Sequence, residues 1–381
     1  MVPGVGELAI VLAGLSLVFV ASAYGFARRQ LRALVPVTPQ ALTNKLLVII
    51  PARNEAARIG ATLQALLRAE LDEGAALHIL VVDDRSSDGT AALVEQLASE
   101  TPGDVTVRVL RLVDDPPAGA FGKPRALHAA VQDARSRGAL TPLVLFLDAD
   151  VVLEPAALGG LVRAHDHCGA DALSGVPRLV TLTRAEQLFV PALASVVTNR
   201  AAPTRVHSSD DATAFLNGQL ILVDSAALDD AGGFAAVERT VLEDVALARA
   251  LKARGKKLRL ADLRMIASTR MYESFAEIDA GFGKNATALL GKSAFAVGIF
   301  AFLTSLLPAA ALVFAGVDAS PLAVAALVLV ALVTALQVLT RKLAGAPVWP
   351  VLVLPLVYAG VMLVLVRASF ARTVTWRGRV Y

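Results

Sequence analysis

Residues 78–90 read HILVVDDRSSDGT, and this stretch decides the fold class. The run 78–82 predicts a short buried strand, which ends on Asp83 and Asp84. Residues 87–90 then cap a helix that continues through Leu93 and Leu97. A buried strand that leads directly into a capped helix is the repeating unit of parallel, doubly wound sheets.

The same unit recurs on both sides of this stretch. Further buried strands are expected at residues 46–50, 105–112 and 143–147, with helices after the first of them and over residues 123–136. Strands that alternate with helices predict an α/β fold with a mostly parallel sheet. Ligands bind such sheets at the carboxyl ends of the strands, so acidic residues at those ends are candidate site residues.

The composition indicates a protein associated with a membrane. Of the 381 residues, 56% are hydrophobic and 18% are charged, whereas soluble proteins average roughly 45–50% apolar residues. A net charge of +3 does not support binding to nucleic acid, which needs a dense basic face. The single cysteine, Cys168, excludes an intramolecular disulfide and a multi-cysteine metal site.

Four uncharged stretches are each long enough to cross a membrane, since about 20 apolar residues span the hydrocarbon core. They are residues 8–26, 294–317, 319–340 and 343–366. Arg28, Arg29 and Arg32 follow the first stretch, and no basic residue precedes it. This asymmetry favours an anchor with its C-terminal side in the cytoplasm. The alternative is a cleaved signal peptide, because residues 21–23 resemble a cleavage site.

The C-terminal topology contains a conflict. Three full crossings after a cytoplasmic Lys292 would place the tail outside, yet the tail carries Arg367, Arg372, Arg377 and Arg379, which favour the inside. One stretch would therefore be re-entrant or interfacial. We expect a cytoplasmic tail and three regions: a membrane anchor at 1–44, a polar domain at 45–292 and membrane segments at 293–381. Residues 186–200 would form a helix that lies in the interface or packs on the sheet.

Two acidic motifs follow predicted strands. Asp148 and Asp150 suit a divalent cation that also holds phosphate oxygens; the alternative is a solvated turn that caps a helix starting near Glu154. Asp83 and Asp84 could bind a nucleotide, or they could accept hydrogen bonds from a local turn.

Two other candidates have similar alternatives. Lys123 could neutralise a diphosphate, although a lone lysine is more often solvated. Glu243 and Asp244 begin an amphipathic helix that is expected to end at Gly255. They could supply a general base, or they could be ordinary acids of a first helical turn.

The order of the motifs along the chain is more specific than any one of them. In sequence they are Pro51-Ala52-Arg53-Asn54-Glu55, the stretch 81–90, Gly122-Lys123, Asp148-Ala149-Asp150, Asn217-Gly218 and Glu243-Asp244. This series resembles the family-2 inverting glycosyltransferases with the GT-A fold. The resemblance covers residues 48–285.

The resemblance implies a role for each motif. Donor binding would use residues from several strand ends and loops, namely Pro51, Ala52, Glu55, Asp83, Asp84, Asp88, Lys123, Asp148 and Arg270. Asp148 and Asp150 (the DxD motif) would also hold Mg²⁺ or Mn²⁺, with Asp150 the stronger candidate ligand. The acceptor side would include Asn217, Gly218, Gln219 and Glu243, and Asp244 would be the general base. The implied donor is a UDP-sugar, and the implied reaction needs no covalent enzyme intermediate.

The sequence departs from many membrane members at one motif. They carry Gln-x-x-Arg-Trp shortly after the base, whereas residues 268–272 read STRMY and residues 281–285 read GFGKN. The departure weakens a comparison with processive polymer synthases and favours transfer of a single sugar. Residues 375–379 read TWRGR and resemble the tails of members that glycosylate lipids. We therefore expect a lipid-like acceptor, a glycolipid product and a cytoplasmic site; the alternatives are a polyprenyl-phosphate sugar transferase and an inactive scaffold.

Overall fold

The computed structural model describes residues 5–99, 101, 103–117, 119–198, 201–290, 293, 295–296, 299, 321–370, 375–376 and 379–380. The chain divides into two compact units. The sheet unit comprises Ala33–Val180 and Ala201–Met271. The helical unit comprises Met1–Arg32, Thr181–Arg200 and Tyr272–Tyr381.

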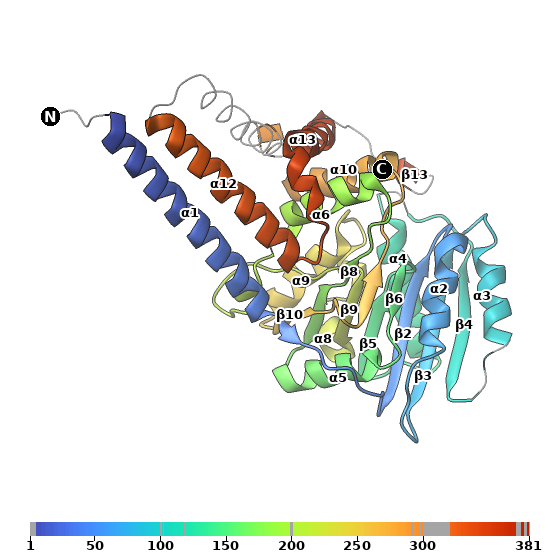
Figure 1. Ribbon diagram of the computed structural model, residues 1–381. Helices are drawn as coiled ribbons and strands as arrows, with labels where there is room; N and C mark the ends of the chain where they lie inside the picture. Colours follow the sequence, from blue (N-terminus) through green and yellow to red (C-terminus); the bar gives the residue numbers. More distant parts are fainter. Residues whose placement is uncertain are drawn as a thin grey trace. The chain divides into compact units, whose positions relative to one another are not determined.

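The sheet unit is built on an eight-stranded sheet in the order β1-β10-β7-β9-β5-β2-β3-β4 (Figure 1). Its strands are β1 (Val35–Pro36), β2 (Lys45–Ala52), β3 (Ala76–Asp84), β4 (Val105–Leu112), β5 (Leu143–Leu147), β7 (Ala172–Val176), β9 (Leu220–Asp224) and β10 (Leu258–Asp262). Neighbouring strands are parallel except that β9 runs antiparallel to β5 and β7. The predicted α/β fold with a mostly parallel sheet is thus confirmed.

Helices cover both faces of this sheet, which explains why its central strands are continuously apolar. Alternate residues of β2 enter different cores: Val48 packs with α2, α3 and α5, and Ile49 packs with α4, α8 and α9. The helices are α2 (Ala56–Leu66), α3 (Thr90–Ser99), α4 (Gly122–Ser136), α5 (Ala157–Cys168), α7 (Pro203–Val206), α8 (Ser225–Asp230), η1 (Phe234–Val237) and α9 (Glu243–Ala253).

A second, three-stranded sheet follows the acidic motif after β5. It consists of β6 (Val151–Leu153), β11 (Ala267–Thr269) and β8 (Arg178–Leu179). The helix expected to start near Glu154 begins instead at Ala157, and its N-cap, Ala156, makes no side-chain cap hydrogen bond. The alternative that Asp148 or Asp150 caps this helix is therefore wrong, because β6 separates them from it.

The helical unit contains α1 (Val5–Ala33), α6 (Arg184–Thr198), α10 (Phe275–Leu290), α12 (Pro321–Leu343), η2 (Trp349–Val353), α13 (Leu354–Phe370) and the short strands β12 (Thr375–Trp376) and β13 (Arg379–Val380). Within the described residues, Ala323–Leu343 and Trp349–Phe370 are long and apolar enough to cross a membrane, by length and composition. The expected stretch 294–317 lies almost wholly outside the described residues.

Close packing joins α6 to other helices of its own unit. The rings of Phe189 in α6 and Phe275 in α10 lie 4.9 Å apart, edge to face. Gly360 in α13 also faces Phe189, since a Cβ at position 360 would lie 2.2 Å from its ring. An ion pair of 2.7 Å links Arg367 in α13 to Asp279 in α10. Helices α10 and α13 therefore pack on the side of α6 that carries Phe189.

Candidate active site

The loops after β2 and β3 are held together by hydrogen bonds between their backbones and side chains. The backbone N–H of Asn54 donates to the hydroxyl of Ser86 at 2.9 Å, and Asn54 Oδ1 accepts from the N–H of Ser87 at 2.9 Å. The N–H of Glu55 donates to the hydroxyl of Thr90 at 2.9 Å. The motifs at 51–55 and 81–90 therefore form one structural element.

Two residues of these loops adopt the left-handed backbone conformation. Asn54 has φ 53° and Arg85 has φ 57°. Residues other than glycine rarely take this conformation, and those that do cluster at functional sites where surrounding contacts hold them. The interlocked hydrogen bonds supply those contacts for Asn54.

Asp88 ties together the starts of α2 and α3. Its carboxylate accepts from the N–H of Ala56 at 3.0 Å and from the N–H of Thr90 at 3.1 Å. Burial opposes ionisation, but the hydrogen bonds from Thr90 and Ala56 outweigh it and hold the pKa of Asp88 below its usual value. Asp88 thus stabilises the loop geometry, and it is not among the residues that line the pocket described below.

Asp83 and Asp84 end β3 in buried positions. Asp83 lies opposite Ala52 in the sheet and accepts a 3.3 Å hydrogen bond from the N–H of Ser86, which is the local turn that the sequence left as an alternative. Asp84 forms an ion pair of 2.6 Å with Arg85. These contacts offset the cost of burying two acids.

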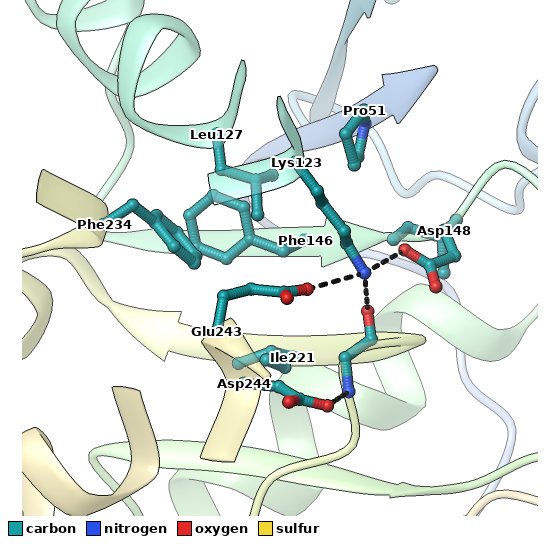
Figure 2. Close-up of a pocket in the computed structure, with 11 residues that line it drawn as sticks. Pro51, Lys123, Leu127, Phe146, Asp148, Ile221, Phe234, Glu243 and Asp244 are labelled. Carbon is teal, nitrogen blue, oxygen red and sulfur yellow. Dashed lines mark hydrogen bonds and ion pairs between the residues drawn. The ribbon is translucent and has the colours of Figure 1, made fainter. Parts of the chain in front are cut away.

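A pocket opens at the carboxyl end of β5 (Figure 2). It is lined by Pro51, Lys123, Leu127, Phe146, Leu147, Asp148, Gly218, Ile221, Phe234, Glu243 and Asp244. Its empty volume, including open solvent at its mouth, is about 240 Å³.

Lys123 reaches into this pocket from the first turn of α4 (Figure 2). Its Nζ lies 2.7 Å from Asp148 Oδ1 and 3.1 Å from Glu243 Oε1. It also donates to the carbonyl oxygen of Gly218 at 3.2 Å. Burial lowers the pKa of Lys123, but Asp148, Glu243 and Asp244 outweigh it and hold the pKa well above its usual value. The alternative that Lys123 is simply a solvated lysine is wrong.

Asp244 lies on the other side of Gly218. Its Oδ2 accepts from the N–H of Gly218 at 2.8 Å, and its Oδ1 accepts from the N–H of Val245 at 2.8 Å. Burial and the neighbouring charge of Glu243 raise the pKa of Asp244 to about 6. A carboxylate with a pKa near neutrality is suited to accept a proton from a hydroxyl group.

The two acids of the DxD motif differ in their surroundings. Asp148 pairs with Lys123, and its N–H donates to the carbonyl of Gln219 at 2.9 Å. The Oδ1 atom of Asp150 is buried and has no hydrogen-bond partner within the described part of the chain. Burial, then the charges of Asp148 and Glu55, raise the pKa of Asp150 to about 7.

These two carboxylates fit a divalent cation. An unsatisfied buried carboxylate oxygen is costly, and a hard cation with oxygen ligands would satisfy it. Within the described residues, no group of three or more His, Cys, Asp or Glu side chains is arranged to hold a metal ion. A cation held by Asp148 and Asp150 would therefore need further oxygen ligands, which a bound diphosphate would supply.

The remaining predicted site residues lie around the pocket or away from it. Asn217 Nδ2 donates to the Gly175 carbonyl at 2.9 Å and to Gln219 Oε1 at 3.0 Å, so Asn217 and Gln219 shape the loop before β9. Arg270 directly follows β11 and does not line the pocket. The structure thus gathers Pro51, Lys123, Asp148, Gly218, Glu243 and Asp244, and leaves Arg270 outside.

Apolar side chains on one side of the pocket were missed by the sequence analysis. Phe146 and Phe234 pack edge to face, with ring centres 4.8 Å apart, and both line the pocket. Leu127 and Ile221 complete this wall. Phe146 lies in a strand that the sequence predicts to be buried, and that position was the available signal for this apolar wall. Apolar residues form no sequence motif that would mark them as part of a site.

Comparisons with known proteins identify the family and the fold of the chain. Residues 43–279 match the family described as glycosyltransferase like family 2. Over 244 residues the chain is 26% identical to a 4,4'-diaponeurosporenoate glycosyltransferase of Staphylococcus aureus, covering 63% of this chain and 60% of the relative. The match therefore spans less than two thirds of that relative's length.

The fold has a counterpart among solved structures. A mannosyltransferase from Pyrobaculum calidifontis, in complex with GDP-Man and Mn²⁺, matches with a TM-score of 0.53 and 19% identity, covering 96% of this chain and 99% of that one. This likeness, with the family match, shows the expected α/β GT-A fold. The chain belongs to the glycosyltransferase like family 2.

Proposed function

We propose that the protein transfers a single hexose from a nucleotide-diphosphate sugar, specifically a UDP-hexose, to a hydroxyl group of a lipid-like acceptor, with inversion. One observation carries the proposal: Lys123 and Asp244 line the same pocket and contact opposite ends of Gly218. Lys123 is the cation that would contact the diphosphate of the sugar donor, and Asp244 is the buried candidate for the base. In-line displacement needs a separate group for each role. The attacking oxygen arrives on one side of the anomeric carbon, and the leaving group departs from the opposite side.

On the donor side, Pro51, Ala52, Glu55 and Asp83 would bind the nucleotide at the ends of β2 and β3, with Asp84 and Asp88 ordering the loop. Asp148 and Asp150 would hold Mg²⁺ or Mn²⁺ together with the diphosphate. The cation would stabilise the negative charge of the departing nucleoside diphosphate. Lys123 would contribute a second positive charge to the same group.

On the acceptor side, Asp244 would take the proton of the attacking hydroxyl. The N–H of Gly218 fixes Oδ2 of Asp244. Asn217 and Gln219 flank Gly218 in the sequence, and Glu243 directly precedes Asp244. Its raised pKa leaves this carboxylate ionised at neutral pH while making it a better proton acceptor than an exposed aspartate.

An anionic acceptor is the second candidate. The name of the staphylococcal relative gives its acceptor as 4,4'-diaponeurosporenoate, and its suffix denotes a carboxylate. A carboxylate or phosphate acceptor would need no base and would leave Asp244 without that role. The acceptor side of this pocket carries Glu243 and Asp244, which repel an anion, so the electrostatics favour a neutral hydroxyl.

The membrane segments support a lipid-like acceptor and a site at the membrane surface. Two described helices have the length and composition of spans, and a carotenoid-type acceptor is named for the relative. The basic residues at 28–32 support a cytoplasmic catalytic domain. The inferred product is a glycolipid, and the inferred location of the protein is the cell membrane, which its helices cross more than once.

Donor binding tests the proposal most directly. Calorimetric titration of UDP-sugars and GDP-sugars into the full chain in detergent, with and without Mn²⁺, should show metal-dependent binding of one nucleotide class. Asp150→Ala should abolish that metal dependence, and the exposed Asp104→Ala should leave it unchanged. Folded protein that binds no nucleotide sugar under any of these conditions would favour the inactive scaffold.

Asp244→Asn separates the two acceptor classes. With a hydroxyl acceptor, this variant should bind donor as the wild type does and lose transfer by about 100-fold or more, because general base catalysis contributes on the order of 10²–10⁴. Full transfer by Asp244→Asn would instead support a carboxylate or polyprenyl-phosphate acceptor.

A further inference from the structure

The three N–H donors of the Lys123 ammonium group already have three acceptors. They are Asp148 Oδ1 at 2.7 Å, Glu243 Oε1 at 3.1 Å and the Gly218 carbonyl at 3.2 Å. A lysine ammonium has three donors and no more. Lys123 can therefore contact a diphosphate only by giving up at least one of these partners.

The position of Lys123 also matters for the space in the pocket. Figure 2 shows its ammonium between Glu243 and Asp148, and the pocket around it has about 240 Å³ of empty volume. The side chain is 33% exposed, whereas that of Glu243 is 11% exposed. Lys123 thus crosses the region between the donor-side acid and the acceptor-side acids, and Glu243 holds it from the more buried side.

We propose that Lys123 is a latch that closes the pocket before the donor binds, and that Glu243 is the residue that holds the latch closed. This inference rests on the proposed donor function. Donor binding removes Asp148 as a partner, since that carboxylate turns to the cation and diphosphate. The N–H freed from Asp148 contacts a diphosphate oxygen first, and the ammonium of Lys123 then leaves Glu243 for further diphosphate oxygens.

The experiment compares nucleoside diphosphate affinity among variants of the full chain in detergent, by calorimetry with UDP, GDP and Mn²⁺. Glu243→Gln removes the charge of one of the three partners of Lys123, whereas Asp244→Asn removes the same charge from the neighbouring residue, which bonds to Gly218. Glu243→Asp keeps the charge and shortens the reach to Lys123. Thermal unfolding checks that each variant is folded.

A latch predicts that Glu243→Gln and Glu243→Asp both bind the diphosphate about five-fold more tightly than the wild type, the fold-change of a partly buried ion pair. Asp244→Asn should change the affinity by less than either. Equal tightening in Glu243→Gln and Asp244→Asn, with none in Glu243→Asp, would show a general charge effect and overturn the latch. Weaker binding in Glu243→Gln would also overturn it, because Glu243 would then position Lys123 for the diphosphate.

The failure of the latch and the failure of the proposed function give different results. Wild-type protein that binds a diphosphate with Mn²⁺, without the variant pattern above, overturns the latch alone. Absence of binding in the wild type and in all three variants overturns both. Binding that appears only in Glu243→Gln and Glu243→Asp supports the latch, since these variants weaken the contact between Lys123 and position 243.

Discussion

The N–H of Gly218 donates a 2.8 Å hydrogen bond to Oδ2 of Asp244 at so close an approach that a Cβ at position 218 would lie 2.9 Å from the same oxygen. Real Cβ atoms essentially never make contacts this short, so any other residue at 218 must displace the carboxylate or the loop. Glycine at this position is therefore tied to the placement of Asp244.

Gly218→Ala should lower the rate of transfer by at least about ten-fold while leaving donor affinity nearly unchanged, because misplacement of a general base affects the chemical step. The measurement is kcat together with donor binding by calorimetry. Gly60→Ala is a matched control, since its Cβ would make an ordinary contact of 3.7 Å with Leu93. Weakened donor binding with unchanged kcat in Gly218→Ala would contradict this placement of Asp244.

The pKa of Asp244, about 6, predicts the acid limb of the pH–rate profile. A general base works only when it is deprotonated, so transfer should fall as the pH drops below about 6 and level off above it. The negative charge of Glu243 raises this pKa, so Glu243→Gln should shift the acid limb to lower pH. The profile is measured at saturating donor, and an acid limb that does not move in Glu243→Gln would count against Asp244 as the base.

Asp88→Ala should destabilise the sheet unit by about 1–2 kcal/mol, because it removes acceptors from the N–H groups that start α2 and α3. The midpoint of thermal unfolding in detergent measures this loss. Asp88→Asn keeps one side-chain oxygen and should recover about half of it. Ser87→Ala, which removes a long hydrogen bond of 3.4 Å to Asn54, should be nearly neutral.

His207 predicts a loss of stability in mild acid. Burial and the charge of Arg259 lower its pKa to about 4, and its Nε2 accepts a 2.8 Å hydrogen bond from the N–H of Leu260. A depressed folded-state pKa means that the stabilisation is present above the unfolded value of about 6.5 and is lost as the pH falls toward 4. Because His207 is partly exposed, we expect the free energy of unfolding to fall by about 1 kcal/mol over this pH range.

Thermal unfolding between pH 7 and pH 4 tests this linkage. His207→Gln offers a side-chain oxygen to Leu260 without a titrating ring, so its midpoint should fall less over this range than that of the wild type. Parallel decreases in both proteins would assign the acid sensitivity to other groups.

Much of the sheet unit could be predicted from local sequence. The strands expected at 105–112 and 143–147 match β4 and β5 in both bounds. Apolar runs of this length and the turn residues between them are local properties, so they report directly on strands that are buried on both faces. The interval after Asp150 was harder, because β6 has only three residues and depends on pairing with β11, far along the chain.

By itself, the sequence determined the fold class, the placement of acidic motifs at strand ends and the family resemblance, all of which depend on residue order and local periodicity. Only the tertiary structure decided what these residues contact. From the sequence, Lys123 could be a solvated lysine or a residue that contacts the diphosphate of the donor. Folding brings it to Glu243 and to Gly218, which is 95 residues away from it in the sequence. The partner of a charge is set by which distant segments meet and by how far water is excluded there, and neither is a local property of the chain.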